Sequence, residues 1–160
     1  MAHQHVTGPF EPKVYPVTLS SGLPAHTIRA GDLVAIVNSR LVPAQNIAWN
    51  TNEATTQTDF ATVFAGLATG NVTAGSADPR QLEVGISQDG ECVFDLAVAV
   101  SGSALEVGSF IGPNGNSGTA LAQGVESVPS KARAVAILTR RAEIGATKCY
   151  GRLVNTVIKR

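Results

Sequence analysis

Residues 82–100, LEVGISQDGECVFDLAVAV, indicate the fold class of this chain most clearly. Apolar residues alternate with polar or small ones over residues 82–86, and the alternation resumes over residues 92–100. Such alternation is typical of strands with one buried face, because successive side chains point to opposite sides of a sheet. The intervening Gln88-Asp89-Gly90 can adopt the positive φ angles of a tight turn, so the segment predicts a β-hairpin.

The rest of the chain has the same pattern of short apolar runs between turns. Sixteen glycines and eight prolines interrupt long helices and favour short strands. Asn38-Ser39 predicts a second tight turn, between strands at residues 32–37 and 40–42. A mainly β fold follows, a compact sandwich or barrel-like domain of roughly eight to ten strands. The other expected strands cover residues 17–19, 105–111, 120–122, 134–139 and 147–157.

One segment, residues 52–64, predicts a short helix. Its apolar side chains recur at helical spacing toward the end, and Asn52 or Thr51 can cap the first turn. We expect two or three helical turns here, then a strand near residues 64–68 and a polar loop over residues 70–79.

The N-terminal segment differs from the remainder. Residues 1–16 contain three prolines and little apolar periodicity, so they predict an extended arm without a core of its own. Residues 17–160 then form a single β-rich domain. An arm can clasp a neighbouring subunit, and the candidate contact residues are Pro9, Phe10, Pro12 and Tyr15.

Charge is sparse and unevenly distributed. Only 15% of the residues are charged and the formal net charge is zero, which gives no support for general binding to nucleic acid or to anionic membranes. Residues 131–160, however, hold eight basic residues against one acidic residue, a net charge of +7. They predict a basic face for an acidic partner, or else cross-strand pairing with acidic strands of the same sheet. The candidate residues of that face are Arg140, Arg141, Lys148 and Arg152.

Catalytic and metal-binding patterns are weak. His3 and His5 lie in the arm without further ligands nearby in the sequence. Glu91 and Asp95 share a strand face about 13 Å apart, farther than the carboxyl pairs of glycosidases. His26 has no recognisable nucleophile motif beside it. We therefore expect a non-enzymatic protein with no cofactor, no metal and no small-molecule substrate.

Other features have ordinary structural explanations. Residues 108–118 are rich in glycine but lack the Lys-Ser/Thr of a phosphate loop, so they predict a long flexible hairpin loop. Trp49 is expected to anchor a core or an interface. Cys92 and Cys149 are expected to be buried thiols. No apolar run approaches the ~20 residues of a membrane span and no signal-peptide pattern begins the chain, so we expect a cytosol-like compartment.

Three blocks of sequence carry a resemblance to a known family. They are residues 30–34, 42–44, 53–61 and 64–68; residues 82–86 and 90–96; and residues 129–132, 134–139 and 152–154. Together they resemble small phage proteins known as capsid decoration or cement proteins, of the DUF2190-like type. The resemblance implies a β-rich homotrimer on the exterior of the virion, made in the host cytoplasm, which stabilises the capsid by binding the major capsid protein at local three-fold positions.

Two other functions remain open. A tail or fibre-type β module that recognises a glycan or a host surface would need exposed aromatic side chains, and Trp49, Tyr15 and Tyr150 are the only Trp and Tyr residues in the chain. A small trimeric enzyme would need a pocket with a perturbed acid or base.

Overall fold

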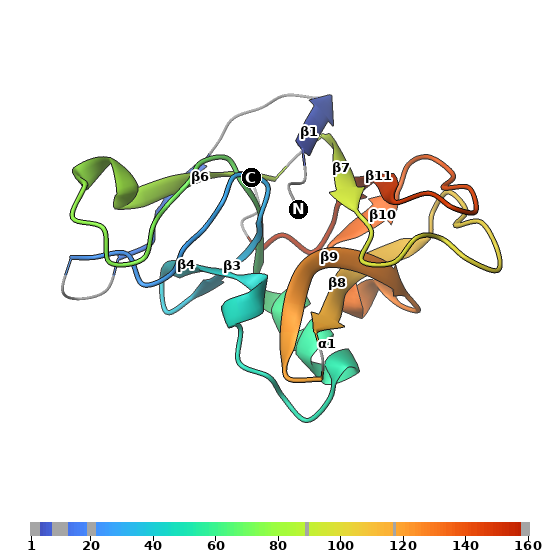
Figure 1. Cartoon of the computed structure of the whole chain (residues 1–160), viewed down its shortest axis with the longest axis horizontal. Coiled ribbons are helices and arrows are strands. Elements are labelled where there is room, and N and C mark those ends of the chain that lie inside the picture. The colour runs from blue at the N-terminus through green and yellow to red at the C-terminus, as the bar shows by residue number, and fades with distance from the viewer. Residues whose placement is uncertain (1–3, 8–12, 19–21, 89, 117, 158–160) are drawn as a thin grey trace.

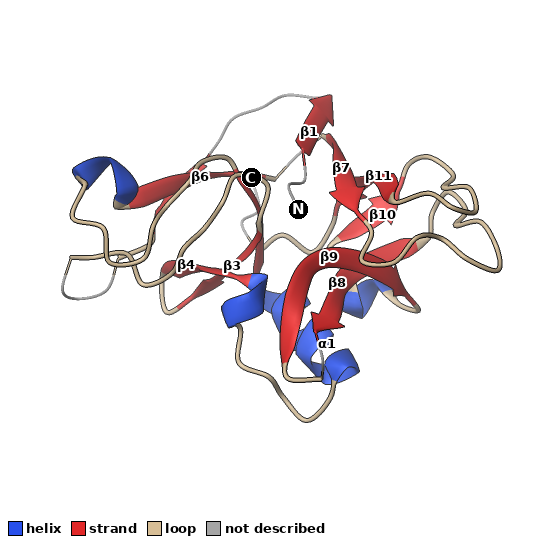
Figure 2. Ribbon diagram, in the orientation of Figure 1, coloured by secondary structure: helices blue, strands red, loops and turns tan. Residues whose placement is uncertain are grey.

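The strands form two antiparallel sheets in the computed structural model, which describes residues 4–7, 13–18, 22–88, 90–116 and 118–157 (Figure 1). The six-stranded sheet has the order β1-β7-β11-β10-β8-β9, and the five-stranded sheet has the order β2-β6-β5-β3-β4. Strands dominate and one α-helix packs below them (Figure 2). The predicted mainly β fold is confirmed.

The described elements have the following bounds. The six-stranded sheet contains β1 (Gln4–Thr7), β7 (Glu91–Asp95), β8 (Phe110–Asn116), β9 (Ala120–Val128), β10 (Ala136–Leu138) and β11 (Lys148–Leu153). The five-stranded sheet contains β2 (Lys13–Pro16), β3 (Leu33–Val37), β4 (Arg40–Pro43), β5 (Phe64–Ala68) and β6 (Glu83–Ser87). The helices are α1 (Glu53–Val63) and the single 3-10 turns η1 (Ala44–Asn46), η2 (Pro79–Gln81) and η3 (Lys131–Arg133).

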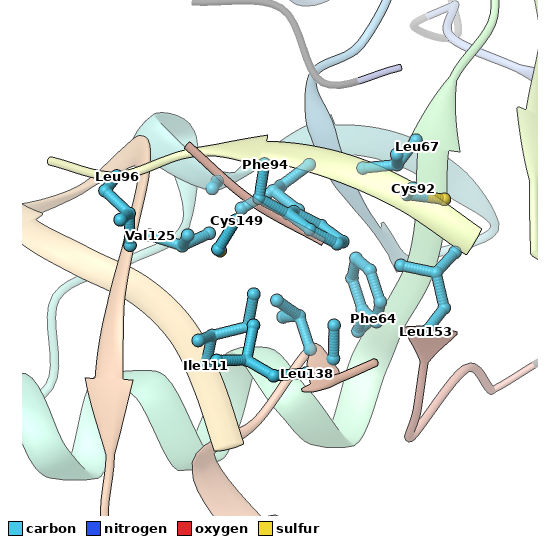
Figure 3. Close-up of a cluster of buried hydrophobic side chains, with 14 of the residues drawn as sticks. Phe64, Leu67, Cys92, Phe94, Leu96, Ile111, Val125, Leu138, Cys149 and Leu153 are labelled. Atoms are coloured by element: carbon cyan, nitrogen blue, oxygen red, sulfur yellow. The ribbon is translucent and has the colours of Figure 1, made fainter. Parts of the chain in front are cut away.

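The five-stranded sheet borders two cores. Leu33 and Ala35 of β3 face a main core, whereas Val34 faces a second core. The main core also receives α1 and most strands of the six-stranded sheet, so both sheets share it (Figure 3). The second core lies within the five-stranded sheet, and β2 lies against β4, so this sheet curls toward a barrel.

Local predictions were accurate where a short segment sets its own conformation. Asn38 and Ser39 have φ angles of 50° and 61° and connect β3 to β4. Asn52 caps α1, because its side chain accepts a hydrogen bond of 2.9 Å from the Thr55 N–H. The strand expected after the helix is β5.

The hairpin predicted from residues 82–100 is wrong in its pairing. Both strands form, but β6 pairs with β2 and β5, whereas β7 pairs with β1 and β11. Val84 of β6 faces the second core and Phe94 of β7 faces the main core. Alternation identifies the buried face of a strand but does not identify its neighbour, and here the chain crosses from one sheet to the other. Asp89 of the expected turn lies outside the described residues.

The N-terminal segment is extended, but its described parts are not separate from the sheets. β1 pairs with β7 at the edge of one sheet, and β2 pairs with β6 at the edge of the other. Edge strands need a partner on one side only and tolerate proline, so a strand such as β2 needs no strong apolar pattern. Tyr15 packs against the second core. Pro9, Phe10 and Pro12 lie outside the described residues.

The flexible loop predicted over residues 108–118 is wrong for most of its length. Residues 110–116 form β8, which pairs with β9 and, at its start, with β10. A Cβ atom at Gly112 would collide with the Arg133 carbonyl oxygen, so this glycine allows η3 to pack closely against the strand.

Candidate functional site

The expected basic face is largely neutralised by ion pairs within the molecule. Lys148 Nζ lies 2.7 Å from Asp95 Oδ1, and Arg140 forms an ion pair with Glu91. Arg152 stands opposite Glu91 in the register of β11 and β7. Acidic and basic strands therefore pair within one sheet, which is the alternative that the sequence left open. The sequence could not choose between the two because strand order is not a local property.

Several contacts fix Arg140 and Glu91 in place. Hydrogen bonds from Thr139 and Arg140 hold the pKa of Glu91 below its ordinary value. The Arg140 guanidinium also lies over the Tyr150 ring, 4.2 Å from its centroid. Groups held in this way suit a fixed surface, and Glu91 and Asp95 do not form an acid-base pair across a cleft.

The two cysteines are buried and free, as predicted. Cys92 and Cys149 lie in neighbouring strands, and burial raises the pKa of each thiol to about 12. Thiols with such a pKa are poor nucleophiles. In the described part of the chain, no group of three or more His, Cys, Asp or Glu side chains could hold a metal ion.

A polar cluster fixes α1 against the β8–β9 hairpin. The fully buried Gln57 donates to the Pro113 carbonyl at 2.8 Å and to Glu126 Oε1 at 2.7 Å, and it accepts from Arg133 Nε at 2.8 Å. Glu53 accepts from the Gly115 N–H. Burial, followed by the nearby Glu126, raises the pKa of Glu53. Because its members bond to one another, this cluster acts as a structural brace.

Two connections at the end of the six-stranded sheet form the most distinctive surface feature. We call residues 96–109 and 139–147 the end loops; they lie side by side at the right of Figure 1. Leu105 and Ala142 exchange two backbone hydrogen bonds of 2.9 Å. Val100 accepts from the Gly145 N–H at 2.8 Å and donates to the Ala146 carbonyl at 2.9 Å. The loops therefore form one cross-linked projection.

Three large apolar side chains on the end loops are exposed to solvent. Val98 is 74% exposed, and Val107 and Ile144 are each 63% exposed. Sequence reasoning missed this site, since it placed Val98 on the buried face of a strand that in fact ends at Asp95. Val107 and Ile144 carried an available signal, because each stands alone between a glutamate and a glycine, whereas Val98 lies within an apolar run.

Trp49 packs against the main core, as expected for an anchor, and it also lines an open cleft.

The sequence matches no protein-family model and no curated protein. Within the described ranges, no helix is long and apolar enough to span a membrane.

Proposed function

We propose that this protein is a non-enzymatic structural subunit of a phage virion. It binds the outer surface of an icosahedral capsid and cements neighbouring capsomers, as a homotrimer at local three-fold positions. The observation that carries the proposal is the projection of the end loops, with Val98, Val107 and Ile144 exposed on it. Exposed apolar groups rimmed by polar residues mark sites of protein contact. The resemblance of three sequence blocks to decoration proteins suggests the capsid as the partner.

The end loops suit binding because they are already ordered by their own hydrogen bonds. A surface fixed in this way loses little conformational entropy when a partner docks. Arg141 forms ion pairs of 3.0 Å with Glu106 and with Glu143, so the charged groups of the rim are held in place by one another. Each contact can be weak, because many copies on one shell, and three sites in a trimer, multiply the attachment.

Quantitative mass spectrometry of gradient-purified particles tests the proposal. We expect copies of this chain per copy of the major shell protein near unity or near a simple fraction such as one third. A handful of copies per particle would place the chain in the tail or connector and contradict the proposal. Complete absence from particles would contradict any structural role in the virion.

Two substitutions test the end loops as the docking surface. Val107→Asp and Ile144→Asp should each weaken attachment to particles by about tenfold or more, because burying an unpaired carboxylate at the contact is unfavourable. Binding of added protein to particles that lack it measures the effect. Leu23→Asp is the matched control, since Leu23 is 37% exposed and lies outside both the N-terminal arm and the end loops. Equal loss in all three variants would remove the end loops from the contact.

Glycan recognition, the second function that the sequence left open, depends on an accessible aromatic ring. Tyr15 packs against the second core, and Tyr150 lies under Arg140. Trp49 lines an open cleft.

A further inference from the structure

An open cleft of about 930 Å³ lies between the β3–β4 hairpin, the connection from η1 to α1, and one side of α1. The connection is the loop at the bottom of Figure 1. The volume of the cleft is within the range of about 300–1,000 Å³ that is typical of small-molecule sites. None of its lining residues belongs to the end loops. The cleft is therefore separate from the surface on which the proposed function rests.

The floor of the cleft is apolar and fixed. Ile47, Trp49 and Val63 line it, and all three also pack against the main core. Packing of one side of these residues restricts their rotamers before any ligand arrives. A tryptophan held in this way offers a large flat apolar surface together with an N–H donor.

The rim of the cleft is polar and electrically balanced. Arg40 and Asp59 contribute one charge of each sign, and burial lowers the pKa of His26, which favours its neutral form near pH 7. Asn50 Nδ2 donates to Asp59 Oδ2 at 2.8 Å, which fixes the carboxylate beside the Trp49 segment. The rim thus presents donors and acceptors without a net charge.

These properties select among ligand classes. A phosphate or a nucleic acid would require an excess of Lys and Arg, and a lipid chain would require an enclosed apolar cavity. A rigid aromatic floor with neutral polar surroundings fits a molecule that has one apolar face and many hydroxyl groups. We infer that this cleft binds a neutral carbohydrate, with Trp49 against the C–H face of a sugar ring and with Arg40, Asn50 and Asp59 hydrogen-bonded to its hydroxyl groups.

Trp49 provides its own probe, because it is the only tryptophan in the chain. The full chain is titrated with maltotriose, cellotriose and triacetylchitotriose while Trp49 emission is recorded. At least one of these neutral oligosaccharides should produce a saturable change, with a Kd on the order of 1 mM as expected for a shallow single site. Sialyllactose and a sulfated disaccharide, each carrying a negative charge, should bind more weakly.

Asp59→Asn tests the contribution of the rim. Asp59 is exposed, so the variant should fold, and the Kd should rise about tenfold because hydrogen bonds to a carboxylate are stronger than those to an amide. Asp78→Asn, in the loop before η2, is the matched control and should leave the Kd unchanged. Trp49→Phe, checked for folding by circular dichroism, should reduce saturation-transfer NMR signals from the sugar.

Several results would overturn the inference. One is the absence of a saturable change with any of the neutral oligosaccharides at up to about 20 mM. Another is tighter binding of the anionic sugars than of the neutral ones. An unchanged Kd in Asp59→Asn would remove the rim from the site. A change in Trp49 emission with a peptide of residues 8–16 of this chain, but not with sugars, would assign the cleft to a second copy.

Discussion

Gly66 determines how β5 contributes to both cores. In the register of β3 and β5, Val34 pairs with Gly66 and Ala35 pairs with Phe64, which leaves one extra residue on β5. Gly66 has a φ of +144°, and a Cβ atom there would collide with the Ser87 carbonyl oxygen. The resulting bulge changes the alternation, so that Phe64 and Leu67, three residues apart, both face the main core.

Gly66→Ala is therefore expected to be strongly destabilising, by about 3 kcal/mol or more, because it combines backbone strain with a backbone collision. Urea unfolding measures the free energy. Gly145→Ala is the matched control: Gly145 has a φ of +88° but open space around it, so only the cost of the left-handed conformation applies, about 1 kcal/mol. Equal destabilisation by the two substitutions would show that the bulge does not depend on close packing at Gly66.

At the scale of elements, Asp32 and Asp78 each lie where a loop gives way to a strand or a helix. Their contributions to stability should nevertheless depend on pH in opposite directions. Asp32 precedes β3, is 4% exposed and accepts from the Arg29 N–H at 2.8 Å. Burial raises its pKa above 3.8. Asp78 caps η2, and hydrogen bonds from Arg80 lower its pKa.

The sign of each effect follows from the protonation of the folded state. A raised pKa means that the folded protein binds the Asp32 proton more tightly than the unfolded chain does, so this contribution to stability is lost as pH rises through the folded-state pKa. The lowered pKa of Asp78 gives a contribution that is present above pH 3.8 and is lost as pH falls through the folded-state pKa.

Asp32→Asn should accordingly stabilise the protein at pH 7, by roughly 0.5–1 kcal/mol for a buried carboxylate that keeps one hydrogen bond. The gain should disappear below pH 3.8. Asp78→Asn should destabilise slightly at pH 7 and have no effect at low pH. Thermal unfolding between pH 3 and 7 distinguishes the two. Destabilisation by Asp32→Asn at every pH would mean that the Arg29 contact outweighs burial of the charge.

At the scale of the whole molecule, the two sheets are joined through the main core. Phe64 of β5 is fully buried and its ring lies 5.6 Å from that of Phe60 in α1. Phe94 and Ile111 of the other sheet belong to the same core (Figure 3). The Gln123 side chain of β9 also accepts from the Leu33 N–H at 2.6 Å, which links β9 to β3 directly. Neither sheet keeps its buried surface without the other.

The protein should therefore unfold as one cooperative unit. Phe64→Ala should lower the free energy of unfolding by about 3–5 kcal/mol, the range for a buried phenylalanine that leaves a cavity. Far-UV circular dichroism and Trp49 fluorescence should agree with each other on one midpoint in the unsubstituted protein, and on one lower midpoint in the variant. Leu41→Ala, in the second core, should likewise lower a single midpoint. Two separate transitions in either variant would show that the sheets are independent.

How much was predictable depends on the range of the interaction. The helix at residues 53–63, the turn at Asn38-Ser39 and the strand at residues 64–68 each depend on a cap, a turn or a local pattern, and the sequence contains all of these. The end loops were not predictable, because the exposure of Val98 depends on where β7 stops. Nor was the cleft, since Trp49, Arg40 and Asp59 line it together only when α1 packs beside the β3–β4 hairpin.

The sequence by itself determined that the fold is mainly β and where most strands and the helix lie. Tertiary structure decided which strands are neighbours. Periodicity records which face of a strand is buried, and this is a property of a few consecutive residues. Partner choice depends on contacts between residues far apart in the chain. For this reason β6 and β7, adjacent in sequence, belong to different sheets, and the acidic β7 lies beside the basic β11.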